Sequence, residues 1–387
     1  MKIAVYGGSF NPPHLGHKSA AETVSQALRP DKFLIIPDNS PPHKEMYAGS
    51  PSPEQRMELC RLNFSDIPGA EISDMEIKRE GKSYTSHTIE ELRKVYPQDE
   101  LLLVMGTDML LTFEEWYRFE YLFKECTLAV LSRDDDDDLA LRKKAQEFEE
   151  EYGAKIEILP HVPLPMSSSE VRERLRLRMG REELTDEVYS CIIKNNYYEA
   201  LPELSWLREK AYQYLKSTRV AHVAGVESEA VLLAKKWGED PETAAEAGIL
   251  HDITKALSYE EQLNLCEKYG IILDNTENET PALLHSKTGA AFSREMFGIS
   301  DEVYEAIYWH TTGKPDMTVL EKIVYLADII EPGRDFPGVD RLRELSYIDL
   351  NEAMAEALKG SMEDVLSQGR TPHENSAKAY EWYAEYQ

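Results

Sequence analysis

The pattern of apolar residues changes about halfway along this chain of 387 residues. In the first half, short apolar runs typical of strands alternate with helical patterns such as Glu54–Phe64, Thr88–Val95 and Leu139–Tyr152. The strand-like runs are Ile3–Tyr6, Phe33–Ile36, Leu101–Met105, Leu128–Leu131 and Ile156–Leu159. Near-continuous apolar strands that alternate with helices are typical of a parallel sheet with helices on both faces. The sequence therefore predicts an α/β, doubly wound first domain, whose ligands bind beyond the carboxyl ends of the strands.

From about Glu203 onward, the strand patterns give way to signals for helix starts and ends. Asp240-Pro241 places an N-cap residue before a proline at the first helical position. Ser258 and Thr318 each begin a capping box, with a glutamate three residues later. Glycines typical of helix ends occur at Gly238, Gly270 and Gly369. This half is therefore predicted to be an all-α domain.

The length of the chain indicates the number of domains, and its net charge argues against one class of function. A chain of this length exceeds one typical core, so we expect two domains, over residues 1–198 and 199–387, with the boundary near Asn196–Pro202. Lys and Arg number 43 against 71 Asp and Glu, which gives a net charge of −28. Such an acidic chain is a poor candidate for nucleic-acid binding.

The cysteines and the terminal segment favour a cytoplasmic protein. The four cysteines lie far apart and form no metal-type pairs, which is typical of reduced thiols. No stretch approaches the roughly 18 apolar residues of a membrane span, and Met1-Lys2 leads directly into a strand rather than a signal peptide. We interpret the run Asp134–Asp138 as a solvated loop that leads into a helix.

The run from Gly7 to His17, GGSFNPPHLGH, follows the first strand-like segment directly. Its glycine pair lets the backbone turn sharply and approach a ligand closely. His14 and His17 are three residues apart, which places them on one side of a starting helix. The free N–H groups of a helix start favour an anion, and imidazoles beside them can donate hydrogen bonds to phosphate oxygens. We therefore expect a nucleoside triphosphate to bind here.

This run resembles the GSFNPxHxGH motif of the nucleotidylyltransferase superfamily, which has a Rossmann-like fold, and within it most closely that of the nicotinate-nucleotide adenylyltransferases. Met166–Arg172, MSSSEVR, combines hydroxyls at a helix start with an arginine one turn later, which suits a phosphate. It resembles the family's second ATP motif, ISSTxVR, with mild changes at its first and fourth residues. Gly106-Thr107-Asp108 resembles the loop that contacts ribose and adenine. The resemblance implies ATP contacts from Gly7, Gly8, Ser9, Phe10, His14, His17, Gly106, Asp108, Ser168 and Arg172.

The segments that we expect to bind the second substrate, the acceptor, have less specific sequence patterns. Pro41–Lys44 offers a cation on a proline-stiffened loop, and Lys82–Thr85 precedes a helix whose start can hold a carboxylate or phosphate. Trp116 can stack on a pyridine ring. By the resemblance, the residues that bind the pyridine mononucleotide are Asn39, Lys44, Thr85 and Trp116. Nicotinamide mononucleotide and phosphopantetheine stay open as alternative acceptors.

The resemblance implies that AMP passes from ATP to nicotinate mononucleotide, giving deamido-NAD and pyrophosphate. The acceptor's 5′-phosphate attacks the α-phosphorus in line, so catalysis consists of positioning and charge stabilisation. We expect His14 and His17 to stabilise the transferring and leaving phosphates and Arg172 to hold the β- and γ-oxygens. Mg²⁺ would arrive with ATP, bound largely by phosphates and water.

Four histidines and two aspartates recur on or beside predicted helices of the second half: His222, His251, Asp252, His285, His310 and Asp328. Histidine and carboxylate ligands together suit iron, manganese or zinc, and helices can carry such ligands into the core of a bundle. Each histidine alone would ordinarily be a core or surface residue, but their joint order indicates a metal site. The adjacent His251 and Asp252 can serve one ion together, and Asp252 can bridge to a second.

The strings HVAGV, HDITK, HSKTGA, HTTG and YLADIIEP around these residues resemble the HD phosphohydrolase superfamily, and most closely the bacterial symmetrical diadenosine tetraphosphate hydrolases with a two-iron centre. The resemblance spans roughly Glu203 to Tyr383. It implies that one metal is held by His222, His251, Asp252 and Asp328, and the other by Asp252, His285 and His310. Two metals supply hydroxide and clamp an in-line displacement at phosphorus. The expected reaction is hydrolysis of diadenosine tetraphosphate to two ADP, with iron as the expected metal.

Two cations near this pattern have two interpretations each. Lys255, one turn beyond His251, is either a catalytic residue that stabilises phosphate or a surface lysine; Arg334 either binds the polyphosphate or lies on the surface. The second domain has the alternatives of another phosphoester substrate or a nucleotide-sensing role. The expected partners are ATP, nicotinate mononucleotide and diadenosine tetraphosphate, and a homo-oligomer is left open.

Overall fold

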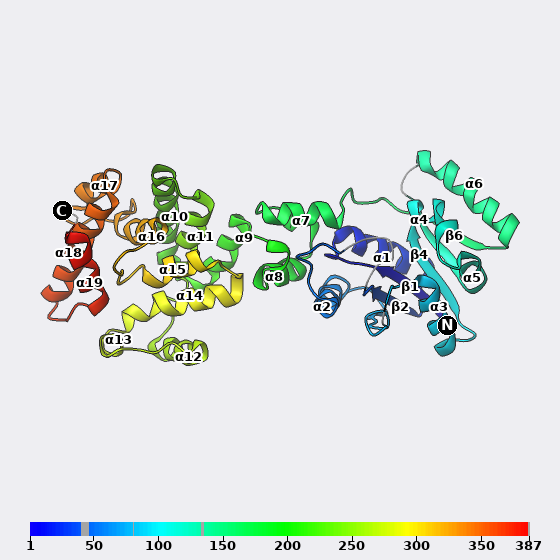
Figure 1. Ribbon diagram of the computed structural model, residues 1–387, viewed down its shortest axis with the longest axis horizontal. Coiled ribbons are helices and arrows are strands. Elements are labelled where there is room, and N and C mark those ends of the chain that lie inside the picture. The colour runs from blue at the N-terminus through cyan, green and yellow to red at the C-terminus, as the bar shows by residue number, and fades with distance from the viewer. Residues whose placement is uncertain (40–45, 80, 133–134, 386–387) are drawn as a thin grey trace. The chain divides into compact units, whose positions relative to one another are not determined.

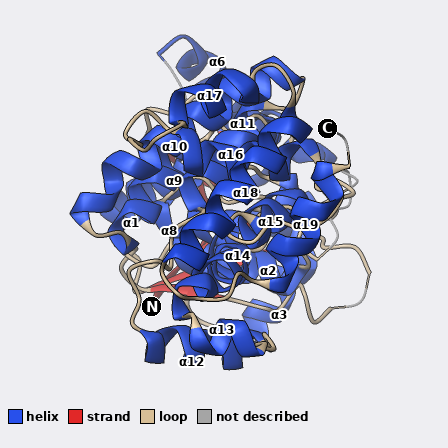
Figure 2. Ribbon diagram, turned by 90° about the vertical axis from the view of Figure 1, so that its left-hand side faces the viewer, coloured by secondary structure: helices blue, strands red, loops and turns tan. Residues whose placement is uncertain are grey.

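The computed structural model describes residues 1–39, 46–79, 81–132 and 135–385. The chain divides into two compact units, Met1–Leu201 and Pro202–Gln387 (Figure 1). Each unit has its own secondary-structure class. The first combines a sheet with helices, and the second consists of helices and the loops that join them (Figure 2).

The first unit is built on a six-stranded sheet in the order β3-β2-β1-β4-β5-β6, and every strand pair is parallel. Its strands are β1 (Lys2–Gly8), β2 (Lys32–Pro37), β3 (Ala70–Ile72), β4 (Glu100–Gly106), β5 (Thr127–Ser132) and β6 (Lys155–Pro160). The strand order reverses between β1 and β4, so their carboxyl ends flank the switch point where such sheets bind ligands. This confirms the doubly wound α/β prediction. Strand β3 was not predicted, because three residues that include Glu71 show no apolar run.

Helices connect the strands of the first unit. They are α1 (Leu15–Leu28), α2 (Pro53–Asn63), α3 (Thr85–Val95), α4 (Thr107–Leu111), α5 (Phe119–Glu125), α6 (Asp135–Tyr152), α7 (Ser168–Arg176) and α8 (Asp186–Lys194), with 3-10 turns η1 (Phe113–Glu115), η2 (Arg181–Glu183) and η3 (Tyr197–Glu199). Of the predicted aspartate loop, residue 134 and the side chains of residues 135–138 lie outside the described part. Helix α6 already begins at Asp135, so most of that run belongs to the helix.

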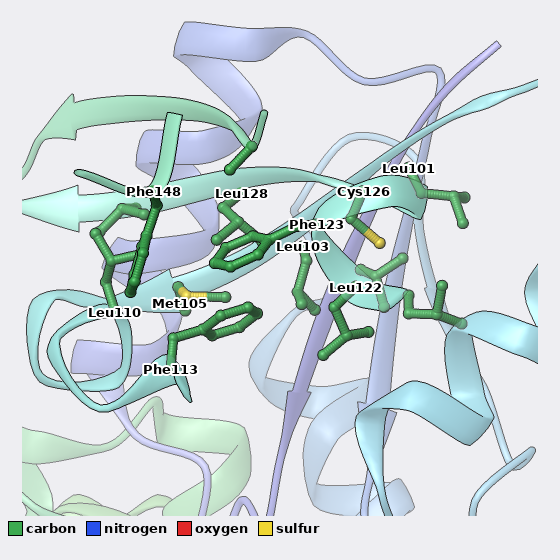
Figure 3. Close-up of a cluster of buried hydrophobic side chains, with 14 of the residues drawn as sticks. Leu101, Leu103, Met105, Leu110, Phe113, Leu122, Phe123, Cys126, Leu128 and Phe148 are labelled. Atoms are coloured by element: carbon green, nitrogen blue, oxygen red, sulfur yellow. The ribbon is translucent and has the colours of Figure 1, made fainter. Parts of the chain in front are cut away.

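Alternate strand residues supply two apolar cores, one on each face of the sheet. Leu101, Leu103 and Met105 of β4 pack with aromatic side chains from α5 and α6, such as Phe123 and Phe148 (Figure 3). The alternate residues of the same strand, Leu102 and Val104, pack on the other face with α1 and α2. Burial on both faces explains why the strands read as continuous apolar runs.

The second unit confirms the all-α prediction. Its helices are α9 (Leu204–Ala211), α10 (Ser217–Trp237), α11 (Pro241–Leu250), α12 (Tyr259–Tyr269), α13 (Asn275–Glu279), α14 (Leu284–Phe297), α15 (Asp301–Trp309), α16 (Val319–Ile330), α17 (Val339–Ser346), α18 (Leu350–Ser367) and α19 (Glu374–Ala384), with 3-10 turns η4 (Tyr212–Tyr214) and η5 (Pro281–Leu283). Ser258 and Thr318 form the predicted capping boxes, and Gly238 and Gly270 end their helices in the left-handed conformation. Among the described residues, no helix has the length and apolarity to cross a bilayer.

Candidate active sites

Two histidines stand at the start of α1, in the loop that follows β1. His14 is the N-cap residue, and Nδ1 of His17 accepts its backbone N–H at 3.2 Å. Because this Nδ1 is an acceptor, a neutral His17 ring carries its proton on Nε2, from which it can donate to a ligand. The two ring centroids lie 3.8 Å apart. Burial lowers the pKa of His14 to about 4, and burial together with His14 holds the pKa of His17 well below its ordinary value. Both imidazoles are therefore neutral hydrogen-bond donors near pH 7.

The titration of His14 gives a testable pH dependence of stability. Its pKa is about 4 in the folded chain against an ordinary 6.5, so the unfolded chain binds more protons between these values. Stability contributed by the neutral ring is therefore fully present above pH 6.5 and falls by up to about 3 kcal/mol toward pH 4. We expect this loss to be smaller in a His14→Asn variant, measured by amide exchange in β1 at both pH values. An identical pH dependence in the variant and the wild type would contradict the assignment.

Phe10 and Gly8 shape the loop around His17. The Phe10 ring is buried in the core, with its centroid 5.1 Å from that of His17 and 5.6 Å from that of Phe64. A Cβ at Gly8 would come within 3.2 Å of the Phe10 ring, so any side chain here would press against that ring. The Phe10 side chain thus supports His17 from behind, although the sequence had placed Phe10 among the ATP contacts.

A cavity of about 670 Å³ opens in front of the two histidines. It brings together most of the predicted ATP residues: Ser9, His14, His17, Gly106, Asp108, Ser168 and Arg172. Two further lining residues, Tyr47 and His161, were not predicted, because they lie outside the quoted motifs. Gly7 and Gly8 line the adjoining cavity instead. The cavity lies at the carboxyl ends of β1 and β4, where the switch point predicted it.

Helix α7 is tied to the opening loop by two side chains. Ser168 Oγ donates to the carbonyl of Pro12 at 2.9 Å, and Arg172 Nη1 donates to the carbonyl of Asn11 at 2.5 Å. Arg172 is 9% exposed, and its guanidinium lies 5.3 Å from the Tyr47 ring centroid. Burial lowers the pKa of Arg172, but a guanidinium keeps its charge at neutral pH. The cavity that the two histidines line therefore also contains a fixed cation.

The second cavity, of about 300 Å³, adjoins the first, and Ser9 and Met109 line both. Of the predicted acceptor residues, Thr85 and Trp116 line it, and Thr85 is the first residue of α3. Asn39 supports the wall of this cavity, because its backbone N–H donates to Oγ of the lining residue Ser83 at 3.2 Å. Lys44 lies outside the described residues.

The second cavity also contains two carboxylates that no sequence motif indicated. Asp38 and Glu76 line it and are 8% and 7% exposed. Burial raises the pKa of Glu76, whose carboxylate accepts a hydrogen bond from Thr88. Nothing in the spacing of these residues signals a shared cavity, because they follow different strands and lie far apart in the sequence.

In the second unit, the six predicted metal residues converge from helices α10, α11, α14, α15 and α16. His222 Nε2 lies 3.0 Å from Asp328 Oδ1, and His251 Nε2 lies 3.4 Å from Asp252 Oδ2. His285 Nε2 lies 3.0 Å from Asp252 Oδ1. The two carboxylate oxygens of Asp252 thus face different histidines, as a bridging ligand requires.

Backbone carbonyls orient three of the histidine rings. Nδ1 of His251 donates to Gly248 at 2.7 Å, and Nδ1 of His285 and of His310 donate at 2.6 Å to the carbonyls three residues before them. Each neutral ring therefore presents Nε2 as an acceptor, and burial lowers the pKa of His285 to about 4. Acceptor nitrogens grouped with carboxylate oxygens at such distances can ligate a shared cation, and carbonyl-anchored histidines are typical of metal sites. The donor set fits divalent metals.

Glu331 positions the fourth histidine. Its Oε1 lies 3.1 Å from His222 Nδ1, and its Oε2 accepts the N–H of Gly333 at 2.5 Å. A Cβ at Gly225 would come within 2.5 Å of Glu331 Oε2, so the glycine makes room for the carboxylate.

We expect Glu331→Ala to weaken metal binding by about 10–100-fold, because the His222 ring loses its orienting partner. Glu331→Gln should retain most of the affinity, since its amide oxygen can still accept the Nδ1 proton. Titration with a chelator, followed by analysis of the metal that each variant retains, measures both affinities. Equal retention by the alanine variant and the wild type would contradict the positioning role.

Three cations lie close to the predicted metal ligands. Arg219 Nε donates to Asp252 Oδ2 at 2.6 Å, and Arg334 Nη2 donates to Asp328 Oδ1 at 2.6 Å. Lys255 Nζ lies 3.0 Å from His285 Nε2, and burial lowers its pKa. Lys255 and Arg334 therefore lie at the cluster, while Arg219 was not predicted because no quoted motif includes it.

A third group of potential ligands is a charge network rather than a metal site. Asp274, Glu277 and His373 lie within coordinating distance of one another. However, His373 Nδ1 accepts the N–H of Asn375 at 3.1 Å, so the ring proton sits on Nε2, 2.8 Å from Asp274 Oδ2. Lys287 Nζ lies 2.5 Å from Glu277 Oε1 and supplies the positive charge. A protonated nitrogen cannot ligate a metal.

Fold and sites together define a nucleotidyltransferase unit followed by an HD-type helical unit. Residues 5–174 match the family model described as cytidylyltransferase-like, and residues 219–333 match the one described as HD domain. The chain belongs to the nicotinate-nucleotide adenylyltransferase family through its first unit and to the HD domain family through its second. This confirms both resemblances seen in the sequence.

Individual relatives each match one half of the chain. A probable nicotinate-nucleotide adenylyltransferase of Carboxydothermus hydrogenoformans is 35% identical over 198 residues, which cover 51% of this chain and 98% of that protein. A symmetrical bis(5′-nucleosyl)-tetraphosphatase of Bacillus subtilis is 36% identical over 174 residues, 44% of this chain and 91% of that protein. A solved HD superfamily hydrolase of Clostridium acetobutylicum, described as involved in NAD metabolism, is 34% identical, covers 49% of this chain and all of its own, and has a TM-score of 0.47.

Proposed function

We propose that the first unit transfers AMP from ATP to nicotinate mononucleotide, giving deamido-NAD and pyrophosphate. The observation that carries this proposal is the pair of adjoining cavities that share Ser9 and Met109. One cavity has the phosphate-binding groups, and the other has an aromatic wall and a helix start. Two substrates bound in adjoining cavities meet at the shared wall, as direct transfer requires.

The chain's own residues position the phosphates and stabilise charge. The acceptor's 5′-phosphate is already an anion, so its attack on the α-phosphorus needs no general base. Nε2–H of His17 donates to an α-phosphate oxygen, and Arg172, which lines the same cavity, holds the leaving pyrophosphate. Fixed donors in a preformed cavity need no reorganisation during the reaction. Mg²⁺ bound with ATP would neutralise phosphate charge.

The acceptor is tested with ATP and one of three compounds: nicotinate mononucleotide, nicotinamide mononucleotide or phosphopantetheine. We expect nicotinate mononucleotide to have the highest kcat/KM, and Trp116→Ala to raise its KM about 10-fold through the loss of stacking. Trp116→Phe is the matched control, and KM for ATP should stay unchanged in both variants. A preference for phosphopantetheine, or an unchanged KM for the pyridine nucleotide in Trp116→Ala, would contradict the assignment.

We propose that the second unit hydrolyses diadenosine tetraphosphate symmetrically to two ADP at a two-metal site. The observation that carries the two-metal proposal is the geometry of Asp252, whose two oxygens face separate histidine groups. His222, His251, Asp252 and Asp328 would hold one metal, and Asp252, His285 and His310 the other. Two such metals, with iron proposed, would supply hydroxide near neutral pH and polarise the phosphate under attack.

The cations around the cluster handle the polyphosphate. Arg219, Lys255 and Arg334 each contact a proposed metal ligand and lie 29–37% exposed at their side chains, so they can also reach substrate oxygens. They concentrate positive charge in a chain whose net charge is −28. Elemental analysis of the purified chain, together with a product assay on diadenosine tetraphosphate, tests this proposal. We expect close to two metals per chain and ADP as the sole product, and a chain that binds none would contradict it.

A further inference from the structure

A groove of about 780 Å³ lies beside the metal-ligand cluster of the second unit. Its walls come from the end of α16, the segment before α17, and helices α17, α18 and α19. The lining residues used below include Ile329, Arg334, Phe336, Lys359, Glu363 and Tyr380. None of the proposed metal ligands lines this groove, so it is an additional site.

Two residues connect the wall of the groove to the cluster. Ile329 follows the metal-ligand residue Asp328 directly, and Arg334 contacts the same aspartate at two points. Its Nη2 donates to Asp328 Oδ1 at 2.6 Å, and its Nε donates to the Asp328 carbonyl at 2.8 Å. A ligand in the groove therefore lies one arginine side chain away from the proposed metal ligands.

The wall that carries Arg334 is braced from behind. Arg343 donates hydrogen bonds to the carbonyls of Ile330, Glu331 and Arg334 at 2.9, 3.1 and 2.8 Å. The turn at Gly338 has a φ of +94°, a conformation that favours glycine. The groove is thus held in shape before a ligand arrives, which lowers the entropic cost of binding.

The lining chemistry fits a purine nucleoside that carries phosphates. Phe336 exposes 39% of its surface on one wall, and Tyr380 contributes a second, half-buried ring. Exposed aromatic rings stack on bases, typically for about 1–3 kcal/mol each. Arg334 and Lys359 are cations for phosphates, and the Glu363 carboxylate can accept from an exocyclic amino group.

We propose that this groove binds one nucleoside half of a dinucleoside polyphosphate, with Phe336 as the stacking residue and Arg334 at the junction between nucleoside and metals. The inference rests on the hydrolase function proposed above. Symmetrical cleavage places the central phosphates at the metals, so each nucleoside lies two phosphates away. A site at the edge of the cluster is where one of them must bind.

Kinetics of Phe336→Ala test the stacking. We expect KM for diadenosine tetraphosphate to rise about 10-fold, with kcat within about twofold and metal content unchanged. Ile348→Ala is the matched control, because Ile348 is 72% exposed on the same unit and does not line the groove. An unchanged KM in Phe336→Ala, or an equal rise in the control, would overturn the proposal.

Photolabelling separates this inference from the hydrolase function itself. The full chain is irradiated with 8-azido-ADP, and labelled peptides are mapped by mass spectrometry. We expect labels on residues 334–342 or 355–364 that diadenosine tetraphosphate displaces and that Phe336→Ala loses. A labelled groove in a chain that does not hydrolyse the dinucleotide would overturn only the hydrolase function. Labels confined to the first unit would overturn the groove assignment.

Discussion

Replacing His17 with alanine is expected to lower kcat for deamido-NAD formation by about 10²–10³-fold, the loss typical when one fixed donor to a developing charge is removed. The ring is held by its acceptor bond from the His14 backbone and by the Phe10 ring, so its Nε2–H has a fixed direction.

The His17→Ala experiment has an internal control in the same chain. Hydrolysis of diadenosine tetraphosphate by the second unit should stay unchanged, which shows that the protein is folded and quantified correctly. Amide exchange in β1 checks the first unit directly. A variant that keeps most of its adenylyl transfer would contradict the role of His17.

Replacing Asp252 with alanine is expected to remove metal from both proposed positions and to reduce hydrolysis at least about 100-fold. Asp252 is 1% exposed, and one of its carboxylate oxygens lies near His251 while the other lies near His285. Its loss also leaves Arg219 without its carboxylate partner. Elemental analysis after dialysis measures the metal, and the product assay measures the hydrolysis.

Two comparisons sharpen the Asp252 experiment. Asp252→Asn keeps the volume of the side chain but loses its charge, so it should lose metal as well if charge and bridging are what matter. Adenylyl transfer should be normal in both variants, which is the reverse of the His17→Ala result. Unchanged metal content in Asp252→Ala would contradict the bridging role.

The sequence predicted those parts of the fold and sites that depend on local patterns. Apolar periodicity located five of the six strands, and helix caps such as Ser258 and Thr318 located the starts of α12 and α16. The metal residues were identified because their order along the chain resembles a known family. The structure brings these six residues together, although they span more than one hundred positions.

Features that depend on long-range packing were not predictable. Glu331 lay within a quoted motif, yet its partner His222 is 109 residues away, so its positioning role appears only in the folded chain. The same holds for Arg219, and for the acceptor-cavity carboxylates of Asp38 and Glu76. The Phe10 side chain packs behind His17 and does not line the first cavity, so its predicted contact with ATP stays a prediction.

We propose that one chain carries two phosphate chemistries, one in each unit. This proposal is tested most directly by chromatographic product analysis of one preparation of the intact chain. The preparation is supplied in one reaction with ATP and nicotinate mononucleotide, and in another with diadenosine tetraphosphate. We expect deamido-NAD with pyrophosphate in the first reaction and ADP alone in the second. The absence of either product, or cleavage of the dinucleotide to ATP and AMP, would contradict it.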